Sequence, residues 1–543
     1  MLITGRHGKR PRPRAPCRFP GASQGLVRVL GEARARLPAP RPASAVPKLS
    51  TRLRISPASY GASSLTSPEE ALLHALARTL GLLAGLFSLA SLAAGADGAW
   101  TWCSQPRRLV PDPAGRTFHV STSGSDPRTC PTWSGATFRT ISRAASCARG
   151  KDTILVHGGT YGPVQISNLW PSDTILITNA PGENPVIEGW GSVPDFSAIV
   201  GLWRVSNIAI QGLEIRNTGI IDAEHGAYGV HVYESTSVKL YYNTVHDTAR
   251  HGILTNGHQI EVVGNEVYNA VMRNQWFRSD YWDAAVTTQP DRNQWGYKLI
   301  GNSIYDSYGE CADILAVDGA TVEGNRIRNC VSTNVFVSNS QNVTLNRNWL
   351  YATNDRFNRP DYGTRATGIQ LANEGKAVGW SLNNIRITNN IIEWVSQGVR
   401  YWKAPHTGKP VKDTYGNLYI AFNDFNRTTF SPIRLDTPEG WSPRANSKLR
   451  RNLVLNANGY RWFSTDQSGS WDVTGNWNYG RDTTSTSPGI KDPWGTSVPA
   501  YELRSGAVIR WTIAPWSEAQ MPSTDYHCQS RSQADWNTPG AIN

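Results

Sequence analysis

The chain has 543 residues, enough for three or four ordinary domains, and a formal net charge of +12. This excess lies in residues 1–68, which contain eleven Arg and two Lys against a single acid, Glu32. Because the whole chain holds 54 bases and 42 acids, 41 of each remain in the rest of it, and this balance excludes a basic surface for nucleic acid there.

The first 96 residues are expected to be a leader. Residues 1–79 are basic and rich in Arg, Pro, Ala and Ser, which predicts disorder. The apolar run Leu80–Leu92 and the small residues up to Ala96 are typical of a signal-peptide core and its cleavage site, and the run is too short for a stable membrane span. Because a signal normally begins near its apolar core, residues 1–68 could instead be an over-extended gene start. An organelle transit peptide is the other interpretation of this segment.

The mature chain then begins with recognisable elements. A strand and a Gly-Ser-Asp loop are expected over Thr117–Asp126, and a helix with a Gly stop over Phe138–Gly150. An apolar strand that ends in Gly-Thr-Tyr follows over Asp152–Tyr161.

A short phrase with the pattern apolar–x–x–Asn–x–apolar recurs through the remainder at a base period of 22–23 residues. The nine copies carry Asn243, Asn265, Asn302, Asn325, Asn348, Asn390, Asn423, Asn452 and Asn476. Repeats of this length predict a solenoid of short strands, in which stacked Asn amides bond to the rungs above and below.

These features resemble the right-handed parallel β-helix proteins of the pectin-lyase-like superfamily over residues 117–480. The resemblance implies an all-β, single-stranded right-handed parallel β-helix over 97–480, with an N-terminal helical cap and long loop insertions. Residues 481–543 lose the period and are expected to form a C-terminal cap. The superfamily contains lyases, hydrolases, epimerases, adhesins and tailspikes, so the fold does not fix the function.

Cysteine usage agrees with export. Six cysteines remain after Cys17, none in a CxxC spacing, so disulfides are expected and zinc is disfavoured. The expected pairs are Cys130 with Cys147, Cys311 with Cys330, and Cys103 with Cys528. We therefore expect a secreted or cell-surface protein.

Alternation along the second strand of each coil places Asp283 and Asp313 on consecutive rungs of one outward column, about 4.8 Å apart. With Glu310 and Asn334 they could form an oxygen-rich calcium site. Alternatively, the two Asp could be the catalytic pair of a glycosidase. The third interpretation is that one of them is a turn residue and the register is shifted.

Nearby residues could complete a catalytic site. β-Elimination on a uronate needs a base and a positive charge, and Arg250 or His251 could supply the base. A solvated Arg250 is the plainer alternative. The residues expected to bind a sugar chain are cationic, aromatic or imidazole side chains, namely His231, Trp276, Trp282, Arg400, Lys403 and Arg434.

The sequence thus predicts a secreted carbohydrate-active protein whose partner is a polysaccharide. The first hypothesis is a polysaccharide lyase that acts on an acidic polysaccharide by metal-assisted β-elimination, with Ca²⁺ as the metal. The alternatives are a glycoside hydrolase that uses Asp283 and Asp313, and a non-catalytic carbohydrate-binding or cell-surface solenoid. The Gly-Asp-Asp and Gly-His-Gly motifs of polygalacturonases and the Asp-Pro-His motif of alginate epimerases are not found. No catalytic role is therefore carried over from a family motif.

Overall fold

A computed structural model places most of the chain between residues 106 and 479. The described residues are 106–191, 193–220, 226–277, 282–374, 379–402, 415–436, 446–455, 460–465, 471–479 and 522–531. The expected leader 1–79, the signal segment 80–96 and most of the expected C-terminal cap lie outside them.

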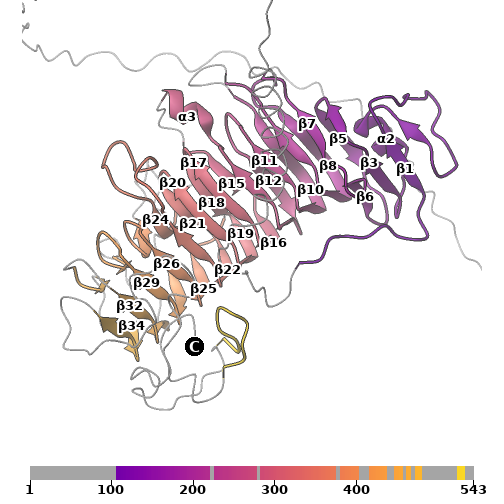
Figure 1. The fold of residues 1–543 in the computed structure, drawn as a ribbon. Coiled ribbons are helices and arrows are strands. Elements are labelled where there is room, and N and C mark those ends of the chain that lie inside the picture. The colour runs from indigo at the N-terminus through magenta and orange to yellow at the C-terminus, as the bar shows by residue number, and fades with distance from the viewer. Residues whose placement is uncertain are drawn as a thin grey trace, which may run out of the picture. The chain divides into compact units, whose positions relative to one another are not determined.

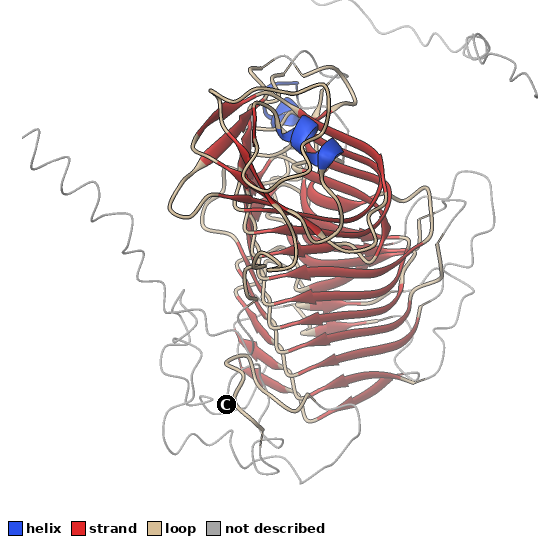
Figure 2. Cartoon of the chain, turned by 90° about the vertical axis from the view of Figure 1, so that its right-hand side faces the viewer, coloured by secondary structure: helices blue, strands red, loops and turns tan. Residues whose placement is uncertain are grey.

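The strands form a parallel β-helix, because each strand pairs in parallel with the strand one turn later (Figures 1 and 2). The first coils contain β1 (Thr117–Val120), β2 (Thr137–Phe138), β3 (Thr153–Val156), β5 (Val164–Leu169), β6 (Ile175–Asn179) and β8 (Ala198–Gln211). The expected parallel β-helix, on which the resemblance to the pectin-lyase-like superfamily rests, is confirmed.

Three faces run along the coil. The first face contains the N-terminal part of β10 (Tyr228–Tyr241), then β12 (Ile253–His258), β15 (Ala284–Thr288), β18 (Glu310–Leu315), β21 (Thr333–Ser338), β24 (Thr367–Ala372), β27 (Val399–Trp402), β30 (Ile433–Arg434) and β33 (Phe463–Ser464). The second face contains the C-terminal parts of β8 and β10, then β13 (Glu261–Val263), β16 (Gln294–Ile300), β19 (Val317–Glu323), β22 (Gln341–Asn346), β25 (Asn383–Thr388), β28 (Gly416–Ala421), β31 (Ser447–Arg450) and β34 (Trp471–Thr474).

The third face is a separate 12-stranded sheet. It contains β4 (Gly159–Tyr161), β7 (Pro185–Glu188), β9 (Glu214–Arg216), β11 (Thr244–His246), β14 (Glu266–Tyr268), β17 (Ser303–Ser307), β20 (Arg326–Cys330), β23 (Trp349–Tyr351), β26 (Ile391–Glu393), β29 (Asp424–Asn426), β32 (Leu453–Leu455) and β35 (Trp477–Tyr479).

A continuous apolar core fills the coil. On the first face, the inward positions of successive rungs are Val230, Ile253, Val286, Ala312, Val335, Ile369, Val399 and Ile433. All of them are buried. One inward side chain per rung from each face produces an apolar stack along the axis, and burial of this stack is the main stabilising contribution to the fold.

The Asn ladder is confirmed over all nine copies. Asn302 shows the pattern: its backbone N and its Nδ2 donate to Asn325 Oδ1 at 2.9 and 3.0 Å, and Nδ2 also donates to Val262 O at 2.9 Å. The residue before each ladder Asn has a left-handed backbone, as Gly264 (φ 66°) and Gly301 (φ 73°) show. This explains the frequent Gly-Asn dipeptide, since glycine adopts that conformation without strain.

The helix expected over Phe138–Gly150 forms as α2 (Ile141–Cys147). The Thr140 side chain caps it by accepting a hydrogen bond from Arg143 N at 3.2 Å, and its buried side packs on β1, β3 and β5. That this helix closes the end of the coil stays a prediction. A second short helix, α3 (Met272–Phe277), lies in the insertion before β15.

Two of the expected disulfides are present, Cys130–Cys147 and Cys311–Cys330, with Cα separations of 5.3 and 5.6 Å. Cys528 is also disulfide-bonded, and its expected partner Cys103 lies outside the described residues. The disulfides indicate an oxidising compartment. None of the helices in the described part of the chain is long and apolar enough to cross a membrane.

Candidate functional site

A cleft of ≈650 Å³ lies over the first face, along β18, β21, β24 and β27. Carboxylate, guanidinium and aromatic side chains line it together. Its lining comprises Trp282, Glu310, Asp313, Leu315, Ser332, Phe336, Arg359, Tyr362, Thr364, Arg365, Thr367, Gln370, Glu374, Ser396, Gln397, Arg400, Trp402 and Phe430. A concave site with this mixture of apolar walls and convergent polar groups is the best candidate for ligand binding in the described chain.

The strand register corrects the predicted pairing of Asp283 with Asp313. In the structure Thr287, not Asp283, lies opposite Asp313, and Val286 lies opposite Ala312. Relative to the neighbouring strands β12 and β21, the predicted alignment was shifted by two residues in β15 and by two residues in β18. A shift of two keeps every side chain on its expected side of the strand, so alternation alone could not detect it.

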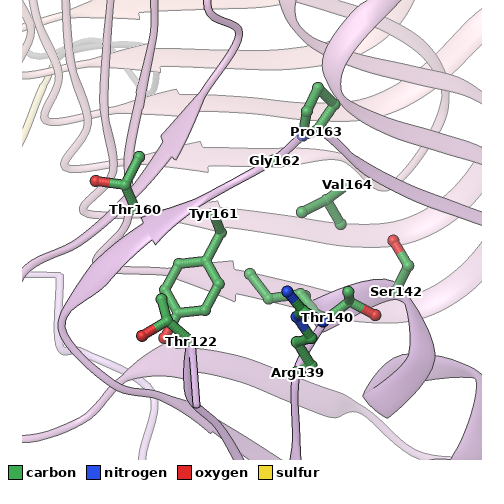
Figure 3. A pocket seen from close by; sticks show the side chains of 10 residues that line it. Thr122, Arg139, Thr140, Ser142, Thr160, Tyr161, Gly162, Pro163 and Val164 are labelled. Atoms are coloured by element: carbon green, nitrogen blue, oxygen red, sulfur yellow. The ribbon is translucent and has the colours of Figure 1, made fainter. Parts of the chain in front are cut away.

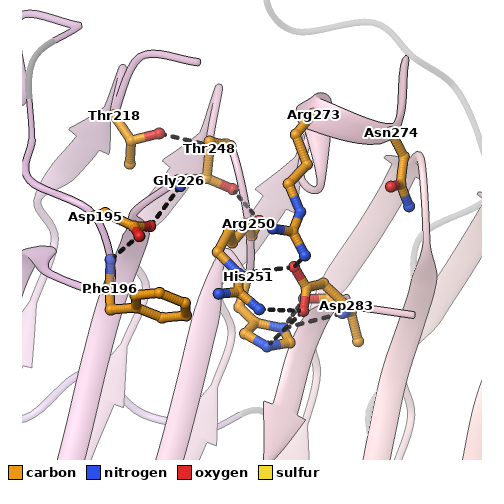
Figure 4. A network of polar contacts seen from close by, with 12 residues as sticks. Asp195, Phe196, Thr218, Gly226, Thr248, Arg250, His251, Arg273, Asn274 and Asp283 are labelled. Carbon is orange, nitrogen blue, oxygen red and sulfur yellow. Dashed lines mark hydrogen bonds and ion pairs between the residues drawn. The ribbon is translucent and has the colours of Figure 1, made fainter. Parts of the chain in front are cut away.

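Asp283 instead belongs to a buried ion cluster (Figure 4). Arg250 donates to both of its carboxylate oxygens, at 3.0 and 3.1 Å, and Arg273 Nη2 lies 2.7 Å from Oδ2. His251 Nε2 lies 3.3 Å from Oδ1, and His251 Nδ1 lies 3.0 Å from both the backbone N and O of Ala284. The cluster therefore fixes the chain where it enters β15.

The electrostatics of this cluster are consistent with that structural role. Burial raises the pKa of Asp283, but His251, Arg250 and Arg273 outweigh burial and hold it below its ordinary value. Burial lowers the pKa of His251, and the nearby Asp283 carboxylate opposes that shift. Neither Arg250 nor His251 lines the cleft, so the structure does not bring the predicted base together with Asp313.

A corrected outward column on the first face unites several of the predicted residues. On successive rungs it contains His231, Leu254, Thr287, Asp313, Phe336, Gln370, Arg400 and Arg434. Asp313 thus lies in the same column as the predicted sugar-binding residues His231, Arg400 and Arg434. At about 4.8 Å per rung, Asp313 and Arg400 are separated by roughly 14 Å of stacked backbone.

Arg400 is the third cation of the cleft lining, beside Arg359 and Arg365. Arg359 and Arg365 pair with Asp361 and Asp355, both at 2.8 Å. Within the described residues, the Arg400 guanidinium has no hydrogen bond or ion pair. Burial, together with the charges of Arg434 and Arg359, lowers the pKa of Arg400, although an arginine remains cationic at neutral pH.

Aromatic side chains form the rim of the cleft. Trp282 is 49% exposed and Tyr362 is 70% exposed, and the guanidinium of Arg359 lies over both rings, at 4.7 and 4.9 Å from their centroids. The predicted Trp276 lies in α3, and Lys403 is outside the described residues. Arg359, Gln370 and Trp402 line the cleft but were not among the predicted site residues. For Gln370 and Trp402, the available sequence signal was their position on a strand of the coil.

The four predicted calcium ligands do not form one site. Asp283 is bonded to the two arginines, and Asn334 Nδ2 points toward Ile327 O at 3.5 Å. Only Glu310 and Asp313 of the four line the cleft. In the ranges that the structure describes, no three His, Cys, Asp or Glu side chains lie close enough together to hold a metal ion. The predicted set therefore does not fit calcium, and no catalytic step is derived through a metal.

A smaller cleft of ≈230 Å³ lies beside α2 (Figure 3). It is lined by Thr122, Arg139, Thr140, Ile141, Ser142, Thr160, Tyr161, Gly162, Pro163 and Val164. Arg139 is the single charged side chain of that lining, so this cleft lacks the paired carboxyl groups of the first-face cleft.

Comparisons with solved structures find parts of this chain similar to several carbohydrate-active enzymes. The pectate lyase Pel9A is 15% identical, with a TM-score of 0.43, over 77% of this chain and 96% of that one. A rhamnogalacturonan lyase is 13% identical, with a TM-score of 0.42, over 69% and 90% of the two chains. The GH136 lacto-N-biosidase from Eubacterium ramulus is 12% identical, with a TM-score of 0.39, over 67% and 68%. No protein-family model matches the sequence, and no curated protein matches it either.

Proposed function

We propose that this protein is a glycoside hydrolase that acts on an acidic polysaccharide bound along the first-face cleft. The observation that carries the proposal is the presence of two carboxyl groups, Glu310 and Asp313, in the same cleft as Arg400. Paired carboxyl groups supply the acid and the base or nucleophile of glycosidic hydrolysis. Arg400 supplies a cation suited to the carboxylate of a uronate sugar.

We take inversion at the anomeric carbon as the proposed route. Glu310 and Asp313 lie three residues apart on β18. Inverting enzymes place their carboxyl groups about 6.5–9.5 Å apart, leaving room for a water molecule between one of them and the sugar. Retaining enzymes need a separation of only about 5–5.5 Å.

The reaction then proceeds in one displacement. One carboxylic acid donates its proton to the glycosidic oxygen while the bond from that oxygen to the anomeric carbon breaks. The other carboxylate removes a proton from the water that attacks the anomeric carbon. The products are two sugar chains, with one water molecule added across the broken bond. Arg400, three rungs away, holds a uronate carboxylate at a neighbouring subsite and fixes the register of the chain.

β-Elimination is the second candidate, and the positive charge of Arg400 favours it. A cation that neutralises a uronate carboxylate makes the C5 proton more acidic. Glu310 or Asp313 could accept that proton as the bond from C4 to the leaving oxygen breaks, and the leaving oxygen takes up a proton from the other carboxylic acid. This route forms a C4–C5 double bond, and the product absorbs ultraviolet light.

The test is an assay of polygalacturonate, alginate and dextran for new reducing ends and for ultraviolet absorbance. Hydrolysis predicts reducing ends without absorbance on an acidic polymer, whereas absorbance would establish elimination and overturn the hydrolase proposal. Glu310→Gln and Asp313→Asn should each lower kcat by about 100-fold or more. Asp318→Asn is the matched control, because Asp318 belongs to β19 on the second face of the same coil. Full turnover by both cleft variants would show that the site is wrong.

A further inference from the structure

A second cleft, of ≈390 Å³, lies on the second face and shares no lining residue with the first-face cleft. Its lining residues belong to the turns that contain β6, β8, β10, β13 and β16. Figure 1 shows where these strands lie along the coil. Its lining comprises Thr174, Asn207, Ser237, Lys239, Gln259, Glu261, Trp295, Gly296 and Lys298. The set contains one large aromatic side chain, several uncharged hydrogen-bonding groups and three charges.

Trp295 presents a fixed aromatic plane to this cleft. Its ring stacks on His258 with a centroid separation of 4.9 Å and an interplanar angle of 14°. Its backbone oxygen accepts a hydrogen bond from Gln259 N at 2.8 Å, yet the residue is 46% exposed. One ring face is thus supported by the imidazole while much of the indole remains in solvent. Such a plane suits the apolar face of a sugar ring.

Polar side chains repeat beside Trp295 on successive rungs. Asn207, Ser237 and Gln259 occupy equivalent left-handed turn positions, with φ of 53°, 55° and 54°. Ser237 Oγ donates to Gln259 Oε1 at 2.9 Å, and Asn207 Nδ2 donates to Pro171 O at 2.8 Å. The next turn position is Gly296 (φ 71°), which has no side chain to obstruct the cleft. The rungs therefore offer hydroxyl and amide groups about every 4.8 Å, a ladder suited to a chain of sugar hydroxyls.

The charges of this cleft favour an anionic ligand. Lys298 Nζ lies 2.8 Å from Glu261 Oε1, and the Tyr241 hydroxyl also donates to Glu261. Burial raises the pKa of Glu261, but Lys298 and Tyr241 outweigh burial and lower it, so Glu261 is ionised and compensates Lys298. Lys239 lies opposite Glu261 in the strand register, and its charge also lowers the pKa of that carboxyl group. Two lysines therefore face one carboxylate in this lining, which leaves a net positive charge for a ligand.

We propose that this second-face cleft is a non-catalytic binding site for an acidic polysaccharide, which stacks a sugar ring on Trp295 and places a carboxylate at Lys239. Its one carboxylate, Glu261, is bonded to Lys298 and Tyr241, so the cleft lacks the pair of carboxyl groups that hydrolysis needs. The site holds a long polymer on the enzyme while another part of the polymer occupies the first-face cleft. It adds avidity for long chains and none for chains too short to reach both clefts.

The experiment measures retention of the full-length protein in gels that contain polygalacturonate, alginate or dextran. Trp295→Ala and Lys239→Gln are compared with wild type and with Trp133→Ala, a control in which a 65% exposed Trp is removed elsewhere. We expect Trp295→Ala to weaken binding to an acidic polymer about tenfold, equivalent to ~1.4 kcal/mol. Trp295→Phe should restore part of that loss because it retains an aromatic plane, and thermal unfolding identifies any variant that fails to fold.

The binding measurements are repeated in the Arg400→Ala background, so that they do not depend on the first-face cleft. Continued retention there, lost on addition of Trp295→Ala, supports the second site whether or not the proposed hydrolysis is observed. On short oligosaccharides Trp295→Ala should cleave at the wild-type rate, while its rate on the long polymer falls. Unchanged retention of both Trp295→Ala and Lys239→Gln on every polymer would overturn the proposal, as would equal losses in Trp133→Ala.

Discussion

Replacement of Asn325 by Ala tests the Asn ladder as a source of stability. Asn325 is fully buried, and its Oδ1 accepts from Asn302 N and Nδ2 at 2.9 and 3.0 Å. Its Nδ2 donates to Leu299 O at 2.8 Å and to Asn348 Oδ1 at 2.9 Å. The substitution removes four hydrogen bonds at a position that water does not reach.

The magnitude follows from which partners are left unsatisfied. Asn348 Oδ1 still accepts from the backbone N of residue 325 at 3.0 Å, and Asn302 Nδ2 still donates to Val262 O. The main losses are therefore the two donor hydrogens of Asn302 that pointed at Asn325. An unsatisfied buried donor costs about 1–3 kcal/mol, so we expect the free energy of unfolding to fall by ~3–5 kcal/mol. This is a large part of the roughly 5–15 kcal/mol that stabilises most domains.

The measurement is equilibrium unfolding in urea, followed by circular dichroism and by tryptophan fluorescence. Coincident transitions in the two signals justify a single free energy for this long coil. Asn354→Ala is the control, since Asn354 is exposed in a loop, and it should change stability by less than about 0.5 kcal/mol. If the free energy of unfolding of Asn325→Ala lies within about 1 kcal/mol of the wild-type value, the Asn ladder does not stabilise the coil and the reasoning is wrong.

Four further predictions concern the first face. The unfolded chain binds a proton at His231 near pH 6.5, but burial, with a contribution from His251, lowers the pKa of the folded protein to about 4. The free energy of unfolding should therefore fall by up to ~3 kcal/mol as the pH drops from about 6.5 to about 4. His231→Phe should remove this pH dependence of unfolding, and an equal pH dependence in the variant would be evidence against it. Asp283→Asn leaves two arginines at a buried site without their carboxylate, so the free energy of unfolding, measured by thermal unfolding, should fall by about 3–5 kcal/mol. A stable variant that has lost turnover would instead indicate that Asp283 is catalytic. Arg400→Ala should weaken binding of acidic glycans about tenfold to 100-fold in calorimetry, while neutral glycans bind unchanged. Chelators should leave cleavage by the wild-type protein unaffected. Inhibition by EDTA that Ca²⁺ reverses would restore the calcium hypothesis.

Much of the fold could be predicted because its signals are local and periodic. The step of 22–23 residues between Asn phrases, the Gly-Asn turns and the capped helix at Thr140 each follow from short segments of sequence. The alternation of inward and outward side chains along each strand is local in the same way, and the buried positions from Val230 to Ile433 follow it. Two rungs, those of Asp283 and Asp313, were misaligned because a shift of two residues satisfies the same alternation.

The candidate site depended on contacts between residues far apart in the sequence. Arg273, in the insertion before β15, forms an ion pair with Asp283, and this carboxylate does not line the cleft. The period of the repeats does not predict the path of such an insertion. Whether the charge of Arg400 is paired likewise depends on which acids lie near it in space.

The sequence by itself determined the coil and its structural ladder, because each rung repeats the same local chemistry and can pack only on its neighbours. Only the tertiary structure decided which side chains share a cleft, since the register between rungs and the path of the insertions are set by packing across the coil. In the structure Asp283 belongs to a buried ion cluster and does not line the cleft, whereas Glu310, Asp313 and Arg400 lie together in the first-face cleft.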